Sequence, residues 1–215
     1  MTATKPRVGA DLRYPLLEPG DHLSRAEFER RYNARPDIKK AELVQGVVYV
    51  PSPARFEEHA EPDNLLGTWL RIYALTHPGV RVGSNGTVRL SDVDEVQPDS
   101  MMWRAGGEAR LDEARYIEGA PELVVEITAS SASYDLHTKK ESYRRAGVRE
   151  YIVWRTLDGE VDWFRLTGGQ YEQVEQDPDG AIESSQFPGL RLEIRELLAG
   201  DDSVVLPPGM RRQPR

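Results

Sequence analysis

The chain has 215 residues, of which 39% are hydrophobic, and it carries a formal net charge of −8 at pH 7. This length suits one domain with a real hydrophobic core. The sequence contains no cysteine, which excludes disulfide bonds and thiolate metal sites. The negative charge argues against a protein that coats nucleic acid by bulk electrostatics.

No stretch approaches the ~18 apolar residues that a membrane helix needs, and residues 1–7 lack the apolar stretch of a secretory signal. We therefore expect a cytoplasmic protein. Residues 1–20 are predicted to be an irregular N-terminal segment. Residues 21–200 are predicted to form one domain, and residues 201–215 a flexible C-terminal tail.

In the first half of the chain, Ser24 to Glu27 form a capping box, which predicts a helix that begins at Arg25. Two strands are predicted within Glu42 to Val50, around a tight turn at Gln45 and Gly46. Apolar residues at helical spacing predict a helix over residues 61–76. A strand is predicted from Val96 to Trp103.

In the second half, Leu123 to Ile127 is predicted as a buried strand. A helix is expected from Asp135, as its N-cap, to Ala146, with Gly147 as its stop. With the next strand, over residues 151–154, these elements indicate a crossover unit. Antiparallel strands near residues 161–166, 170–174 and 181–184 then predict a meander, followed by a short strand and a helical turn within residues 190–198.

Glu126 lies inside the apolar strand. Side chains alternate along a strand, so Glu122, Val124 and Glu126 share one face. A carboxylate in such a place is costly unless something neutralises it. The alternative is a half-exposed strand whose glutamates are solvated. The apolar Val124 on the same face argues against that alternative.

Lys139 falls on the same helical stripe as the core-facing residues Leu136, Tyr143 and Ala146. From there it can reach the carboxylates of the strand. The alternative is that Lys139 extends along the helix flank to water. If the helix is rotated by one residue, Lys140 instead of Lys139 is the lysine that reaches the carboxylates.

Asp99 follows Pro98, which lacks a backbone donor and therefore belongs at a sheet edge or a bulge. A bulge re-aims the next side chain, as is common near active sites. Two carboxylates and a lysine that converge at a sheet edge suit a hard divalent cation and a phosphodiester. The sequence therefore predicts a metal-dependent nuclease.

These segments resemble the Uma-type restriction endonucleases, a family of bacterial proteins long treated as a domain of unknown function within the PD-(D/E)xK nuclease superfamily. The resemblance covers about Leu43 to Leu166. The pieces that carry it are Glu42 to Gly46, His59, Gln97 to Asp99, Pro121 to Ile127, Tyr134 to Tyr143 and Ala146 to Tyr151. It implies an α/β, restriction-endonuclease-like fold, with a central mixed sheet flanked by helices and an antiparallel C-terminal meander.

By that resemblance, Asp99 and Glu126 are the metal-binding acids for Mg²⁺ or Mn²⁺. The superfamily's lysine usually lies two residues beyond the second acid, where this chain has Thr128, and this points instead to Lys139 on the helix. Glu42 is then an accessory ligand or base, and the alternative for it is a strand-end charge in water. His59 and Lys140 are candidate substrate contacts. DNA is the implied partner, and a homodimer is compatible with cutting both strands.

Two other functions are compatible with parts of the pattern. One is a catalytically silent nuclease-fold module that binds DNA or a protein partner. The other is a glycosidase with two carboxylates ~5–9.5 Å apart. A glycosidase needs neither a lysine nor a metal, so the place of Lys139 argues against it.

Overall fold

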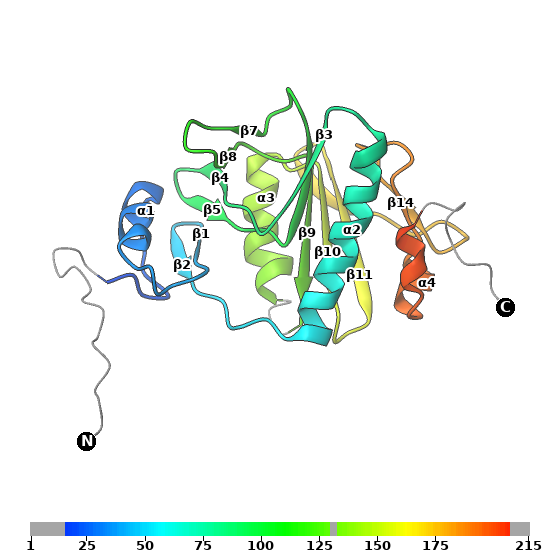
Figure 1. Ribbon diagram of the computed structural model, residues 1–215, viewed down its shortest axis with the longest axis horizontal. Coiled ribbons are helices and arrows are strands. Elements are labelled where there is room, and N and C mark those ends of the chain that lie inside the picture. The colour runs from blue at the N-terminus through cyan, green and yellow to red at the C-terminus, as the bar shows by residue number, and fades with distance from the viewer. Residues whose placement is uncertain (1–15, 130–132, 207–215) are drawn as a thin grey trace, which may run out of the picture.

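The computed structural model describes residues 16–129 and 133–206 and is a mixed α/β structure (Figure 1). Its centre is a six-stranded sheet in the order β12-β11-β10-β9-β6-β3. β9 and β10 are parallel, and the other neighbouring strands are antiparallel. The strands are β3 Val80–Ser84, β6 Ser100–Arg104, β9 Leu123–Thr128, β10 Glu150–Arg155, β11 Glu160–Thr167 and β12 Gln170–Gln173.

A second sheet lies beside the first and has the order β2-β1-β5-β4-β8-β7. Its strands are β1 Glu42–Val44, β2 Val47–Tyr49, β4 Val88–Ser91, β5 Asp94–Val96, β7 Arg110–Leu111 and β8 Ile117–Glu118. The predicted turn between β1 and β2 is confirmed. Gln45 and Gly46 have φ values of 52° and 77°, as a type I′ turn requires at both central positions.

The predicted strand from Val96 to Trp103 is wrong as a single element. Val96 ends β5 in the second sheet, and Ser100 begins β6 in the central sheet. Pro98, which has no N–H to donate to a ladder, lies at the crossing. The segment from Gln97 to Asp99 therefore passes from one sheet to the other.

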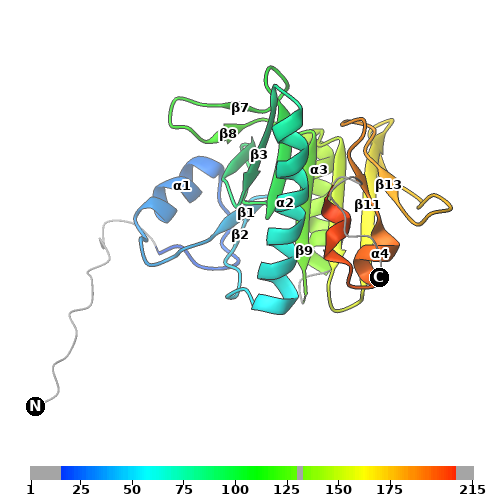
Figure 2. The same cartoon turned by 45° about the vertical axis from the view of Figure 1, so that its right-hand side comes forward.

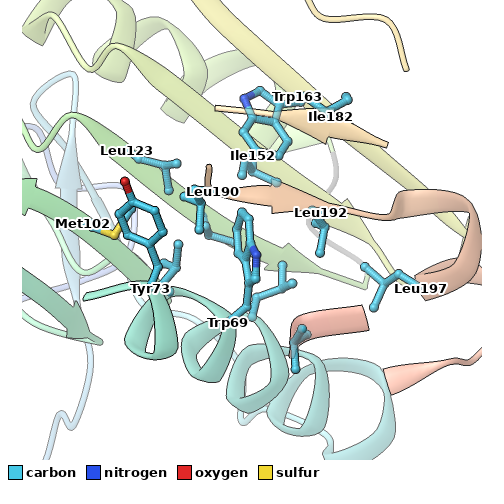
Figure 3. Packing of buried hydrophobic residues seen from close by; sticks show 14 of the residues in the cluster. Trp69, Tyr73, Met102, Leu123, Ile152, Trp163, Ile182, Leu190, Leu192 and Leu197 are labelled. Atoms are coloured by element: carbon cyan, nitrogen blue, oxygen red, sulfur yellow. The ribbon is translucent and has the colours of Figure 1, made fainter. Parts of the chain in front are cut away.

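Helix α2 (Glu61–Thr76) covers one face of the central sheet, and a π-helical segment, η1 (Phe56–Ala60), precedes it (Figure 2). Its apolar stripe packs against side chains of β9, β10 and β11. Trp69 meets Trp163 edge to face, with ring centroids 6.0 Å apart (Figure 3). Burial of each large apolar side chain contributes roughly 1.5–3 kcal/mol, so this layer fixes α2 on the sheet.

The other face of the sheet is covered by the helix that contains the predicted lysines. It begins as a π-helix, η2 (Tyr134–Lys139), and continues as α3 (Lys140–Ala146). Asp135 is not the N-cap that was predicted, because it lies within the first turn and is buried. The predicted stop is confirmed, since Gly147 caps α3 in the left-handed conformation at φ 90°.

The predicted N-terminal helix is confirmed as α1 (Arg25–Asn33), and the Ser24 hydroxyl accepts a hydrogen bond from the Glu27 N–H. It packs against β1 and β2 through Phe28, which is fully buried with Leu43. No helix among the described residues is long and apolar enough to cross a lipid bilayer.

Near the C-terminus the structure differs from two predictions. β13 (Ile182–Glu183) does not continue the meander but pairs with β14 (Arg191–Leu192) as a separate two-stranded sheet. After α4 (Ile194–Leu198), the 3₁₀ helix η3 (Asp202–Val205) buries two valines in the core under α2. Residues 202–205 are therefore packed and do not form the flexible tail predicted from residue 201, and residues 207–215 lie outside the described residues.

Candidate active site

Glu126 lies on the face of β9 that is covered by η2 and α3. The apolar neighbours Val125 and Ile127 point to the α2 side, while Val124 packs with Tyr143 on the opposite side. This is the alternation expected from the sequence. Only 3% of Glu126 is exposed, so its carboxylate requires partners inside the protein.

Lys139 supplies one of those partners. Its Nζ donates to Glu126 Oε1 at 2.7 Å and lies 3.0 Å from Glu42 Oε1. The structure thus places Lys139, rather than Lys140, against the carboxylates. The Lys140 ammonium lies 3.3 Å from the ring centroid of Phe164 instead, and the structure does not bring it into this cluster.

Tyr143 is a partner that the sequence reasoning did not identify as a site residue. Its hydroxyl donates to Glu126 Oε1 at 2.6 Å, and the side chain is fully buried. The signal was present in the sequence, because Tyr143 lies four residues after Lys139 and shares its helix face. On that face the sequence pattern predicts Tyr143 as a core-packing residue beside Lys139.

Glu42 begins β1 in the second sheet and is buried, so it is not the solvated strand-end charge considered above. Its Oε1 accepts a hydrogen bond from the backbone N–H of Gln97 at 2.7 Å. Glu42 therefore links the second sheet to the segment that carries Asp99.

Asp99 lies just before β6, opposite Glu126. Ser100 pairs with Val125 in the antiparallel ladder, and this register, continued by one residue, sets Asp99 beside Glu126. Asp99 Oδ2 accepts a hydrogen bond from the N–H of Ile127 at 2.8 Å. Four candidate residues from separate chain segments (Glu42, Asp99, Glu126 and Lys139) therefore converge.

A histidine and a lysine lie on the outer side of Asp99. His59 Nε2, on η1, lies 3.3 Å from Asp99 Oδ1, and Lys40 Nζ lies 3.6 Å from the same oxygen. His59 was predicted as a substrate contact. Lys40 was not singled out, because it precedes β1 in an irregular segment without any periodic pattern.

The electrostatics of the cluster follow from burial and from the proximity of like charges. Burial raises the pKa of Glu126 to about 8; Lys139 acts against this shift, and Asp99 and Glu42 add to it. Burial alone would lower the pKa of Lys139, but the carboxylates, foremost Glu126, raise it well above its ordinary value. Lys139 is therefore a charged ammonium among buried acids.

Asp99 behaves in the opposite way. Burial acts to raise its pKa, but the hydrogen bond from His59 and the charge of Lys40 outweigh burial and hold the pKa below its ordinary value. The cluster thus contains one carboxyl, Asp99, whose ionisation is favoured and one, Glu126, whose ionisation is opposed by burial and, to a lesser extent, by its acidic neighbours.

Within residues 16–129 and 133–206, no group of three or more His, Asp or Glu side chains forms a ready-made metal site. The donors that converge here are the hard carboxylate oxygens of Asp99 and Glu126. Mg²⁺ is commonly held by one or two carboxylates and completes its shell with water and substrate oxygens. The raised pKa of Glu126 also reflects repulsion between acids that a cation relieves. The donor set therefore fits Mg²⁺ or Mn²⁺.

Comparison with known proteins adds a family to this geometry. Residues 25–195 match the family model Uma2, described as "Putative restriction endonuclease". The chain belongs to the Uma2 family. The resemblance inferred from the sequence motifs is thereby confirmed, and it extends over most of the described residues.

A solved structure from Anabaena variabilis ATCC 29413, described as "a putative nuclease belonging to DUF820", has the same fold. The match has a TM-score of 0.61 at 15% sequence identity and covers 91% of this chain and 96% of the other. This likeness confirms the predicted restriction-endonuclease-like α/β fold. No curated protein matches the chain.

Proposed function

We propose that this protein is a divalent-cation-dependent endonuclease that hydrolyses phosphodiester bonds in DNA. The observation that carries the proposal is the position of Lys139, whose ammonium lies between Glu126 and Glu42 at hydrogen-bonding distance. Membership of a family of putative restriction endonucleases supports the same reaction class.

In this proposal Asp99 and Glu126 hold the cation through their carboxylate oxygens. When bound there, a Mg²⁺ or Mn²⁺ ion supplies positive charge at the attacked phosphate and lowers the pKa of the attacking water. The Lys139 ammonium keeps the carboxylates of Glu126 and Glu42 in place and adds positive charge where negative charge develops on phosphorus. Glu42 is the accessory residue, and its carboxylate would act as the base that accepts a proton from the attacking water.

The remaining groups set the geometry. The backbone N–H of Ile127 fixes Asp99, and the Tyr143 hydroxyl fixes Glu126, so neither carboxylate has to reorganise when substrate arrives. His59 lies at the outer edge of the cluster, where it can contact the substrate. Cutting both strands of a duplex in one encounter requires two such sites, so we propose a homodimer as the form that linearises DNA.

The proposal is tested by incubating supercoiled plasmid with purified protein and Mg²⁺ or Mn²⁺. We expect nicked or linear product, and Asp99→Asn to lower the rate by at least about a hundredfold because it removes one charged ligand. The matched control is Asp158→Asn, because Asp158 is an exposed acid that pairs with Arg155. We expect this variant to retain wild-type activity. Cleavage by Asp99→Asn at the wild-type rate contradicts the assignment.

The silent-module alternative is separated by a second measurement. Mn²⁺ should raise the melting temperature of the wild type in proportion to ln(1 + [L]/Kd), and Asp99→Asn should remove that shift. DNA binding without any cleavage, at any divalent cation tested, supports the binding module instead.

A further inference from the structure

The two lysines at the candidate site differ in their access to solvent. Lys139 is buried, with only 4% of its side chain exposed, and its ammonium is already engaged with Glu126 and Glu42. A substrate that arrives from solvent does not reach this group without displacing its partners. Lys40 has 29% of its side chain exposed, beside an Asp99 side chain that is only 3% exposed.

Lys40 and His59 are the partly exposed groups that flank the outer oxygen of Asp99. They reach Oδ1 from different segments: Lys40 from the chain before β1, and His59 from η1 at the start of the α2 layer. A phosphodiester placed beside Asp99 Oδ1 would therefore lie within reach of both side chains.

Asn85 holds Lys40 in this position. The Asn85 Oδ1 atom accepts a hydrogen bond from Lys40 Nζ at 3.3 Å, and its backbone N–H lies 3.0 Å and 3.1 Å from the carbonyl oxygens of Pro98 and Asp99. Asn85 adopts a left-handed backbone conformation, with φ at 53°. Strained backbone of this kind persists where surrounding contacts enforce it, and it clusters at ligand sites.

We propose that Lys40 is a substrate-binding residue that, with His59, binds the nonbridging oxygens of a DNA phosphodiester as it enters the site. Lys139 then remains with the carboxylates throughout. The inference rests on the proposed nuclease function and deepens it by naming the group that contacts the phosphate. The chemistry suits the task, because an ammonium offers a compact charge with three donors, and a chain with a net charge of −8 depends on local cations to hold DNA.

The test compares Lys40→Gln with Lys39→Gln. The control removes a neighbouring lysine whose Nζ donates to the Pro36 carbonyl oxygen and does not contact the cluster. Binding of a labelled duplex is measured by fluorescence anisotropy over a series of salt concentrations. Ca²⁺ replaces Mg²⁺ so that the duplex stays intact during the measurement.

We expect Lys40→Gln to weaken binding about tenfold and to reduce the slope of log K against log [salt] by about 0.9, the value for one lost phosphate contact. Lys40→Arg should retain most of the wild-type affinity and most of the wild-type salt slope, because arginine keeps the positive charge. Melting temperatures of the three variants are recorded alongside. If Lys40→Gln has a lower melting temperature, the salt series is repeated at a temperature where this variant is folded. A reduced slope of log K against log [salt] under those conditions still supports the inference, since a purely structural loss does not change the number of phosphates neutralised.

Equal binding and equal salt slopes for Lys40→Gln and Lys39→Gln, with a wild type that binds and cuts, overturn this inference and leave the nuclease proposal standing. A wild type that neither binds nor cuts DNA overturns both.

Discussion

Glu126 and Glu95 are two buried acids in different regions of the molecule, and burial raises the pKa of each to about 8. Their surroundings differ. Glu95, on β5, faces Glu29 of α1, and Arg89 Nε lies 2.9 Å from Glu29 and 3.6 Å from Glu95. These charges connect α1 to the second sheet.

Glu126, in contrast, lies where four chain segments converge beside partly exposed cations. Its ion pair with Lys139 connects the central sheet to η2, and Asp99 extends the cluster toward solvent. A strongly shifted carboxyl is therefore not sufficient evidence for an active site, because structural ion-pair networks produce the same shift. The convergence of distinct chemical groups separates the two regions.

The largest expected effect comes from removing the cation at the centre of the Glu126 region. Lys139→Met leaves two buried carboxylates without their partner, and we expect a loss of about 3–5 kcal/mol in the free energy of unfolding. Lys140→Met is the adjacent control, which loses a cation–π contact with Phe164, about 0.5–1 kcal/mol, and the attraction to Asp162. Urea denaturation measures both, and equal losses would show that Lys139 is not the central cation.

A smaller effect tests the hydroxyl on the same carboxylate. Above the Glu126 pKa of about 8, Tyr143→Phe removes a hydrogen bond to a charged acceptor, and we expect a cost of about 1.5–3 kcal/mol there. Tyr151→Phe is a matched control in an equally buried position, because its hydroxyl donates at 3.1 Å to the neutral carbonyl of Asp135. Its expected cost is about 0.5–1.5 kcal/mol. The reverse order in urea denaturation would contradict the assignment of Glu126 as a charged acceptor.

The effect with the smallest step, counted per pH unit, is expected in the Glu95 region. The folded protein holds the Glu95 proton more tightly than the unfolded chain, since the pKa rises from 4.5 to about 8. Glu95 therefore contributes stability that is fully present below pH 4.5 and is lost as pH rises through about 8, with a slope of at most about 1.4 kcal/mol per pH unit.

Glu95→Gln should flatten this dependence, measured as the free energy of unfolding at a series of pH values for both proteins. The Glu126 region is unchanged in the variant, so the difference between the two curves isolates Glu95. Parallel curves would show that Glu95 does not titrate in this window.

Much of this fold follows from local sequence rules. The Ser24 cap, the Gln45-Gly46 turn and the Gly147 stop are each set by one or two residues, and all three appear as predicted. The alternation around Glu126 and the helical stripe through Lys139 place both groups on facing surfaces. These patterns are local, so they can be read from the sequence alone.

The features that were missed depend on contacts between distant residues. The segment from Val96 to Trp103 reads as one continuous strand, but Val96 ends β5 in the second sheet and Ser100 begins β6 in the central sheet. Lys40 has no pattern of its own and gains meaning only from its distance to Asp99. Glu95 stands in a run of acidic residues that resembles a solvated segment, and only the packing of α1 shows that it is buried.

The wide turn of η2 gives this arrangement a tolerance to change in chain length. In η2 the Lys140 N–H reaches back five residues to the Asp135 carbonyl, whereas an α-helical turn reaches back four. Tyr143 is fixed by its hydrogen bond to Glu126, and Gly147 ends the helix beyond it. We therefore expect the loss of one residue within η2 to convert this turn to an α-helical one, with the helix after it held in place.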